Sequence, residues 1–252
     1  MTNTSAAFFD LDGTLIPGSA NIPLAKSAFR QGFIGKTDLL KDLRNGLSFL
    51  LKGATDQRSE QVRDRILRAV AGHRAEDVEA LGDHFIDDLV ASMKPAMREV
   101  LDQHGRAGQD RIVISASPTE IVSRLAGTAG LEVGVGTTAA RDAAGVYTGE
   151  LVGPFCYSEG KVQVMRALAD ERGYDLADCF AYSDSVSDLP MLTAVGHPVA
   201  VNPEPELREI AVRRGWPIVE TSSVPRVKLT SARGLARLMR NAFGAAGRRV
   251  IA

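Results

Sequence analysis

Short apolar runs alternate with helix-like stretches over most of this chain, and that alternation limits the folds that it can adopt. Continuous short apolar runs are typical of buried strands in a parallel sheet, because both faces of such a sheet are covered. The stretches between them carry apolar residues at helical spacing, as amphipathic helices do. Strands that alternate with helices predict an α/β fold with a doubly wound parallel sheet. The expected strands are 6–9, 111–115, 133–138, 179–182, 198–201 and 218–219, with a hairpin turn at 142–145, and the expected helices between them are 96–104, 119–130, 161–172, 190–195 and 204–214.

One long segment interrupts this alternation. Between residues 20 and 93 no strand-like run occurs, and apolar residues recur at helical spacing opposite a charged face. We expect an all-helical block of about four short helices here, inserted after the first strand as a lid over the sheet. The apolar stripes comprise Leu39, Leu40, Leu43, Leu47, Leu50 and Leu51; Val62, Ile66, Ala69 and Val70; and Val78, Leu81, Phe85, Ile86, Leu89 and Val90. The chain is therefore divided into a core of residues 1–16 and 94–222, a helical cap of residues 17–93, and a basic, amphipathic tail of residues 223–252.

Charge and composition argue against several classes of protein. The chain has 30 basic and 31 acidic residues and a net charge of -1, so its charge gives no reason to expect a nucleic-acid partner. The apolar run near the N-terminus follows no basic residue and stops at Asp10, which is unlike a secretory signal. No stretch approaches the roughly 20 apolar residues that cross a membrane. Cys156 and Cys179 form neither a disulfide framework nor a zinc motif, so we expect a cytoplasmic protein with reduced thiols.

Polar side chains stand where several of the expected strands end. Asp10 and Asp12 follow the first apolar run, Ser115 ends the second, and Asp184 follows the fourth. Each of them alone could be an ordinary turn or cap residue. Ligands of open α/β sheets, however, bind at the carboxyl ends of the strands. The sequence therefore predicts that these carboxylates and this hydroxyl lie at one edge of one sheet.

The spacing of the first two carboxylates indicates a metal site. In an extended chain alternate side chains share a face, so Asp10 and Asp12 can point into one site. Two close carboxylates repel each other unless a cation joins them. Mg²⁺ prefers oxygen ligands and keeps water molecules that a phosphate can replace, and Asp184 could supply the next ligand. Gly13 permits a tight turn beside a phosphate, and Thr14 offers a hydroxyl and an amide to phosphate oxygens.

These residue types suit the hydrolysis of a phosphate ester. Phosphate monoesters react very slowly in water, so a catalyst must supply a large electrostatic stabilisation. Mg²⁺, Lys161 and the amides of the loop could hold the developing charge. A carboxylate nucleophile divides the hydrolysis into two easier steps through an acyl phosphate. A second carboxylate could protonate the leaving oxygen and later deprotonate water.

The order of these elements resembles the haloacid dehalogenase (HAD) superfamily. Asp10-Leu11-Asp12-Gly13-Thr14-Leu15 is similar to motif one of that superfamily, and Ile112-Val113-Ile114-Ser115-Ala116-Ser117 to motif two. Gly160-Lys161, which opens an expected helix, resembles motif three, and the segment 181–190 resembles motif four. The match covers about residues 6–220, and a helical insertion directly after motif one is similar to the type-one cap of subfamily IB, of which phosphoserine phosphatase is a member.

The resemblance implies a role for each matching residue. Asp10 would be the nucleophile and a magnesium ligand, and Asp12 would be the acid and base that binds the metal through its carbonyl group. Asp184 would be a further metal ligand, and Asp188 and Ser187 would support the metal site. The residues that would hold the phosphoryl group are Gly13, Thr14, Ser115, Ala116 and Lys161.

The sequence also departs from the phosphoserine phosphatase pattern. That family usually carries, soon after motif one, a glutamate that binds the amino group of the substrate, whereas the stretch 16–23 contains no acid. It also usually has asparagine where this chain has Ser187. Without the acid an ammonium group has no obvious partner. We therefore expect a small phosphorylated metabolite as the substrate, with a phosphoserine-like ester as the less favoured option.

Two alternative functions share the first motif. One is a phosphatase for a lipid phosphate, such as a lysophosphatidate or a phosphatidylglycerophosphate, because the tail could lie on an anionic membrane; we favour a solvated or disordered tail instead. The other is a phosphoryl-transferring mutase. Oligomeric state cannot be predicted from this sequence. The basic residues of the tail are Arg233, Arg237, Arg240, Arg248 and Arg249.

Overall fold

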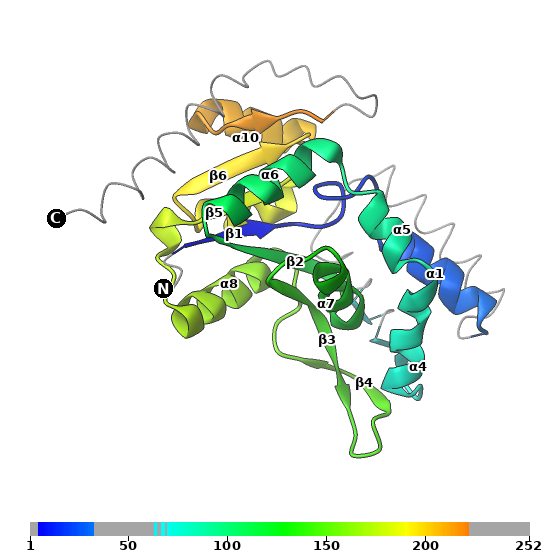
Figure 1. Cartoon of the computed structure of the whole chain (residues 1–252). Helices are drawn as coiled ribbons and strands as arrows, with labels where there is room; N and C mark the ends of the chain where they lie inside the picture. Colours follow the sequence, from blue (N-terminus) through cyan, green and yellow to red (C-terminus); the bar gives the residue numbers. More distant parts are fainter. Residues whose placement is uncertain (1–4, 33–62, 65–66, 69, 222–252) are drawn as a thin grey trace.

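A seven-stranded sheet runs through the middle of the molecule, in the order β4-β3-β2-β1-β5-β6-β7 (Figure 1). The computed structural model describes residues 5–32, 63–64, 67–68 and 70–221. The strands are β1 (Ala6–Phe9), β2 (Asp110–Pro118), β3 (Val133–Arg141), β4 (Tyr147–Val152), β5 (Phe180–Ser183), β6 (His197–Val201) and β7 (Ile218–Val219). All neighbouring strands are parallel except β3 and β4, which form an antiparallel hairpin. The chain begins at the central strand and extends to both sides of it, so the predicted doubly wound sheet is confirmed.

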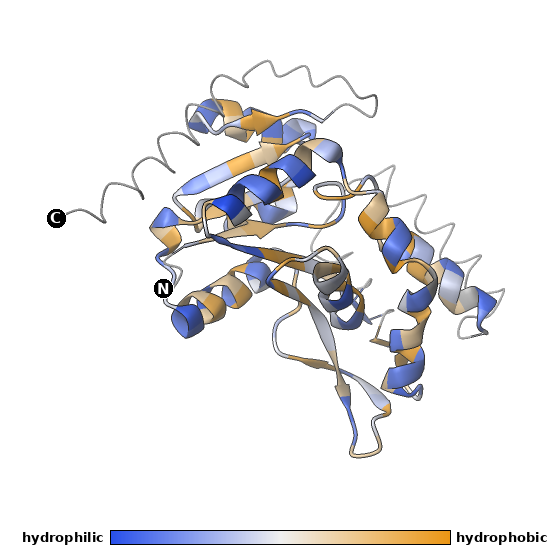
Figure 2. Ribbon diagram, viewed as in Figure 1, coloured by the Kyte–Doolittle hydropathy of each residue, from blue (hydrophilic) through white to orange (hydrophobic). Residues whose placement is uncertain are grey.

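Helices cover both faces of this sheet. The helices of the core are α6 (Pro95–Arg106), α7 (Thr119–Thr128), α8 (Glu159–Arg172), α9 (Leu189–Thr193) and α10 (Pro205–Arg214). Alternate side chains of a strand point to opposite faces. Ala7 and Phe9 therefore belong to the hydrophobic cluster that contains α6 and α7, whereas Ala6 and Phe8 belong to the cluster that contains α8, α9 and α10. Figure 2 shows the matching pattern, with hydrophobic and hydrophilic sides on the same helix.

The predicted helical insertion lies between β1 and α6, on one side of the sheet (Figure 1). Its described elements are α1 (Asn21–Arg30), α4 (Ala75–Ala80), the 3-10 helix η1 (Leu81–His84) and α5 (Ile86–Ala91), and no strand occurs among its described residues. The apolar stripe from Val78 to Leu89 is buried, but it spans three short elements instead of one helix, because Phe85 leaves the helical conformation at φ -149°. The stripe from Leu39 to Leu51 lies outside the described residues, as does the tail 223–252.

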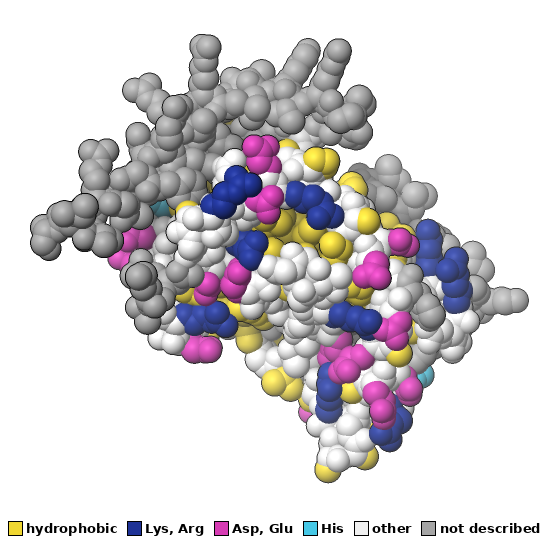
Figure 3. Space-filling view, in the orientation of Figure 1, with side chains coloured by type: hydrophobic (Ala, Val, Ile, Leu, Met, Phe, Trp, Pro, Cys, Tyr) yellow, Lys and Arg dark blue, Asp and Glu magenta, His cyan; other side chains and the backbone are white. Residues whose placement is uncertain are grey.

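The β3–β4 hairpin attaches this insertion to the sheet. Three backbone hydrogen bonds join them: Gly72 N donates to Tyr147 O at 2.8 Å, Tyr147 N donates to His73 O at 3.0 Å, and Ala75 N donates to Gly145 O at 2.9 Å. Ion pairs add to this attachment on the face that Figure 3 shows, where basic and acidic side chains are interspersed. Arg141 of β3, for example, contacts Glu79 of α4 at 3.0 Å and Glu120 of α7 at 2.9 Å.

A chain of polar side chains, buried at Tyr182 and His104 and half-buried at Gln109, links α6 to the centre of the sheet. His104 of α6 is fully buried, with Nδ1 2.7 Å from Gln109 Oε1 and Nε2 2.8 Å from the Tyr182 hydroxyl. An amide oxygen only accepts, so Nδ1 carries the proton and Nε2 accepts from Tyr182. Burial lowers the pKa of His104 to about 4, which keeps the ring neutral. The backbone carbonyl of Tyr182 accepts a hydrogen bond of 3.0 Å from Asp10 N, so this chain supports the residue that follows β1.

Two strands are longer than the sequence indicated. β2 continues to Pro118, so Ser115 lies within the strand and not at its end, and β3 continues to Arg141 because it pairs with β4. The predicted turn at 142–145 joins these two strands. Within the described part of the chain no helix has the length and apolar character needed to cross a membrane.

Candidate active site

Lys161 lies between two carboxylates at the carboxyl ends of the central strands. Its Nζ is 2.6 Å from Asp10 Oδ1 and 2.7 Å from Asp188 Oδ2, and all three residues are buried. Asp10 directly follows β1, and Asp188 ends the 3-10 helix η3 (Val186–Asp188) after β5. The three residues are far apart in the sequence, so the fold brings together the groups that the motif order singled out.

The start of α8 places Lys161 at this position. Gly160 precedes it, and a Cβ at Gly160 would lie 1.7 Å from the carbonyl oxygen of Phe155, so only glycine permits this close packing. Ser158, which precedes the helix, has φ 50°, a conformation that non-glycine residues adopt rarely. The predicted Gly-Lys opening of a helix is confirmed, because α8 begins at Glu159.

The two carboxylate oxygens of Asp188 differ in their hydrogen bonding within the described part of the chain. Its Oδ2 accepts from Lys161 Nζ and from the Ser183 hydroxyl, the latter at 2.7 Å. Its Oδ1 is buried and has no hydrogen-bond partner among the described residues. A buried carboxylate oxygen without a partner is unfavourable, so Asp188 retains capacity for a further donor or a cation.

The carboxylate of Asp12 turns toward the chain that follows it. Oδ2 accepts from the Ser19 hydroxyl at 2.6 Å, and Oδ1 accepts from Ala20 N at 2.9 Å. Burial raises the pKa of Asp12, while these two hydrogen bonds and the charge of Lys161 act in the opposite direction. The Asp12 carboxyl group is thus fixed by two hydrogen bonds, and its protonated form is more favoured than that of an aspartate in water.

Asp184 packs directly against the turn of the first motif. Thr14 donates from its hydroxyl to Asp184 Oδ1 at 2.9 Å, so this hydroxyl is engaged by a carboxylate and only the amide of Thr14 is left for a phosphate. Gly13 has φ +76°, and a Cβ there would lie 2.1 Å from Asp184 Oδ2. Gly13 is therefore required twice, for its backbone conformation and for the approach of Asp184.

We expect Gly13→Ala to reduce turnover strongly, on the order of 10²-fold, because the added methyl group must displace Asp184. Gly145→Ala is the matched control, since Gly145 has the same φ of +76° but nothing within 4 Å of a Cβ. Both variants carry the strain of an alanine at positive φ, so the melting temperature should fall slightly in both. Activity should fall in Gly13→Ala alone. Equal activity of the two variants would contradict the role of this contact.

Ser115, Ala116 and Ser187 have local partners in this structure. The buried hydroxyl of Ser115 accepts from Ser117 N at 3.2 Å, and the carbonyl of Ala116 accepts from the Thr137 hydroxyl at 2.9 Å. Ser187 donates its amide and hydroxyl to Ser185 Oγ, at 3.3 and 3.1 Å. In the register of β1 with β2, Phe9 pairs with Val113, so Ser115 reaches the same edge of the sheet as Asp10. Ser187 instead stabilises the turn that presents Asp188.

The electrostatics of the site favour an added cation. Burial raises the pKa of Asp10 to about 8, opposed by Lys161 and assisted by the charges of Asp188 and Asp184. Burial likewise raises the pKa of Asp184 to about 6. Burial lowers the pKa of Lys161, but the carboxylates of Asp10 and Asp188 outweigh it and leave that pKa raised. Negative charge is thus in excess around Asp10, and a cation would favour its ionised form.

The donors present fit Mg²⁺. They are carboxylate and carbonyl oxygens, which Mg²⁺ prefers, and the unpartnered oxygen of Asp188 adds capacity at the same place. Across the described ranges, no three His, Cys, Asp or Glu side chains are grouped closely enough to hold a metal ion by themselves. A metal here would therefore need backbone oxygen or water as well.

Lys94 is a site residue that the sequence analysis missed. It immediately precedes α6 and donates from Nζ to the carbonyl oxygen of Gly13. A lone lysine in front of Pro95 has no motif around it, so the only available signal was its position at the return of the chain from the insertion. Ser19 and Ser183, which hold Asp12 and Asp188, had equally weak signals.

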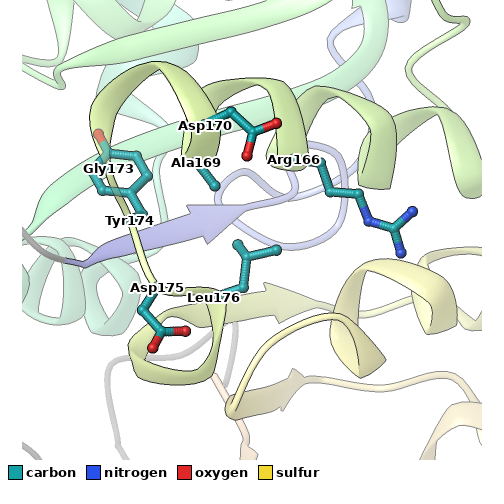
Figure 4. A pocket seen from close by; sticks show the side chains of 7 residues that line it. All are labelled: Arg166, Ala169, Asp170, Gly173, Tyr174, Asp175 and Leu176. Atoms are coloured by element: carbon teal, nitrogen blue, oxygen red, sulfur yellow. The ribbon is translucent and has the colours of Figure 1, made fainter.

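A cavity of about 580 Å³ lies elsewhere, at the carboxyl end of α8 (Figure 4). Arg166, Asp170, Asp175 and Leu176 are among its lining residues. It adjoins the segment that leads into β5, at the edge of the sheet opposite the carboxyl ends of the strands. None of the predicted site residues lines it, so this cavity is separate from the candidate active site.

Comparisons with known proteins agree with this geometry. The family of haloacid dehalogenase-like hydrolases matches residues 7–193. The chain is 39% identical to a probable phosphatase of Mycobacterium tuberculosis, over 86% of this chain and 76% of that protein. It is 36% identical to a phosphoserine phosphatase of the same organism, over 85% of this chain and 70% of that protein. A solved structure of a protein of unknown function from Bordetella pertussis is similar, with a TM-score of 0.75, 30% identity, and coverage of 86% of this chain and 98% of that chain.

The chain therefore belongs to the haloacid dehalogenase-like hydrolases. Within that family it is an enzyme of the phosphatase type.

Proposed function

We propose that this protein is a Mg²⁺-dependent phosphatase that hydrolyses a small phosphate monoester through an aspartyl phosphate on Asp10. The observation that carries the proposal is the buried bridge of Lys161 between Asp10 and Asp188, with Asp184 beside the same loop. This arrangement supplies a fixed ammonium group next to the carboxylate that would attack phosphorus. Positioned charge of this kind is the main contribution that proteins make to phosphoryl transfer.

The proposed reaction has two steps. In the first, an oxygen of Asp10 attacks phosphorus, the bond from phosphorus to the ester oxygen breaks, and Asp12 gives its proton to the departing alcohol. In the second, Asp12 takes a proton from a water molecule that attacks the same phosphorus, and inorganic phosphate leaves Asp10. The raised pKa of Asp12 supports its role as the acid in the first step.

Lys161 and the backbone of the first motif would hold the phosphoryl group during both steps. The amide of Gly13 donates to the Gly18 carbonyl at 2.9 Å, so the loop is closed on itself, and Ser115 stands on the neighbouring strand. Asp10, Asp184 and the Asp12 carbonyl would hold Mg²⁺, which when bound would neutralise charge on the carboxylates and on the phosphate oxygens.

The helical insertion is proposed as the cap that limits access to Asp10. Asn21 begins α1 and accepts a 3.3 Å hydrogen bond from Ser117, which follows Ser115 on β2. This neutral contact stands near the position where an acid would be needed for an ammonium group. We therefore propose a small metabolite other than phosphoserine as substrate, with a cytoplasmic location. Among the residues that the structure describes, no observation favours a lipid phosphate or a mutase reaction over this proposal.

A phosphate-release screen tests the proposal. The full chain would be incubated with amino-acid, amino-alcohol, sugar, polyol and lysophospholipid monophosphates, with Mg²⁺ and after treatment with EDTA. We expect release from at least one soluble ester, a loss of activity of about 10²-fold or more after EDTA, and recovery when Mg²⁺ is returned. Turnover that survives chelation would refute the metal requirement. Release from the lysophospholipid alone would favour the lipid alternative, and isomerisation of a sugar phosphate without release would favour a mutase.

A further inference from the structure

Lys94 joins the return of the insertion to the loop that carries the nucleophile. Its backbone N donates to the Leu15 carbonyl at 2.9 Å, and its Nζ donates to the Gly13 carbonyl. Pro95 follows at once as the first residue of α6, which fixes the backbone direction after Lys94. The lysine is thus attached to the loop at two points, two residues apart.

The ammonium group of Lys94 also lies near the carboxylates of the proposed metal site. The Gly13 residue that it contacts packs on Asp184, since a Cβ on Gly13 would lie 2.1 Å from Asp184 Oδ2. Burial lowers the pKa of Lys94, whereas the charges of Asp184 and Asp10 act to raise it. Lys94 is only partly buried, unlike Lys161.

We propose that Lys94 is a positioning residue that acts as a built-in counter-ion of Asp10 and Asp184, holding the nucleophile loop in place while opposing Mg²⁺ binding. The inference rests on the proposed function, because it concerns the same carboxylates. It adds a second lysine with a role distinct from that of Lys161. Lys161 contacts Asp10 directly, whereas Lys94 acts through the carbonyl of Gly13 and through its charge.

This role has a consequence that a purely structural role lacks. A positive charge near metal-binding carboxylates repels Mg²⁺, so removal of the charge should tighten Mg²⁺ binding. Loss of a loop contact alone would loosen the site and weaken Mg²⁺ binding. The two interpretations therefore predict changes of opposite sign.

The test is the affinity for Mg²⁺ alone, measured by titration calorimetry on the full chain without substrate. We expect Lys94→Met to bind Mg²⁺ more tightly, on the order of fivefold, and Lys94→Arg to bind it as the wild type does. Lys26→Met is the matched control, because Lys26 is an exposed lysine of α1, and its affinity should be unchanged. If circular dichroism shows that Lys94→Met does not fold, Lys94→Gln makes the same comparison.

Unchanged or weaker Mg²⁺ binding in the neutral variant would overturn the inference. Tighter binding in Lys94→Arg equal to that of Lys94→Met would also overturn it, since the charge would then not be responsible. If either of these results is found while the wild type binds Mg²⁺ and releases phosphate, the inference about Lys94 fails but the proposed function stands. A wild type that binds no Mg²⁺ would refute both the inference and the proposed metal requirement.

Discussion

Replacing Asp10 with asparagine should abolish phosphate release, with a loss of turnover on the order of 10⁴-fold. Asparagine has nearly the same shape but cannot form an acyl phosphate. It keeps an oxygen that can accept from Lys161, which remains paired with Asp188 at 2.7 Å. Steady-state turnover of the best substrate from the screen, measured with Mg²⁺, is the readout.

The variant should remain folded. Burial raises the pKa of Asp10 to about 8, so the protein gains little stability from its ionised form, and the melting temperature should not fall. Asp170→Asn is the matched control, because Asp170 is an exposed residue at the cavity on α8 and should retain full activity. Asp10→Asn activity within tenfold of the wild type would exclude Asp10 as the nucleophile.

Replacing Lys161 with methionine should reduce both turnover and stability. The change leaves Asp10 and Asp188 buried without their shared cation, and removal of one partner of a buried ion pair destabilises by about 3–5 kcal/mol. Turnover should fall by about 10³-fold, because a fixed positive charge next to the reacting phosphoryl group is lost. Lys26→Met serves as the control for the loss of a lysine side chain.

The stability of Lys161→Met should depend on pH in a defined direction. The pKa of Asp10 is raised in the folded state from 3.8 to about 8 even with Lys161 present, and without Lys161 it should rise further. A carboxyl group whose pKa is higher in the folded state binds more protons there than in the unfolded chain, so stability is lost as pH rises. Wild type and variant should therefore lose stability in parallel between about pH 4 and pH 8, and the melting temperature of the variant relative to wild type should fall only above about pH 8, where Asp10 ionises in the folded wild type but stays protonated in the variant. A difference between the two melting temperatures that is the same at about pH 7 and about pH 9 would contradict the action of Lys161 on Asp10.

Much of the core could be predicted because its signals are local. The run at 6–9 is a strand with those same bounds, and α8 begins within two residues of its predicted start. Such elements follow from continuous apolar runs and helical spacing, which are properties of neighbouring residues. The continuation of β2 through Ser115 was missed because its last residues pair with a strand that only the fold places beside them.

The site was predicted unevenly for a similar reason. Asp10, Lys161 and Asp188 meet as the order of the motifs implied. The expectation that Asp10 and Asp12 share one site stays a prediction. β1 ends at Phe9 and the Asp12 carboxylate accepts from Ser19, while the charge of Lys161 acts on both carboxylates. Lys94 could not be found in this way, because its partner Gly13 is distant in the sequence and is contacted through the backbone.

The hydrogen-bonded chain of Tyr182, His104 and Gln109 limits which substitutions homologues of this protein can accept. Tyr182 donates to His104, and His104 donates to Gln109, so the chain of donors runs in one direction only. A change at Tyr182 or His104 removes the buried hydrogen bond between them, and the loss of such a bond costs about 1–3 kcal/mol. The backbone carbonyl of Tyr182 also accepts from Asp10 N, so such a change would lie next to the proposed nucleophile. Homologues that differ at one of these three positions should therefore differ at the others, so that the set is inherited as one unit.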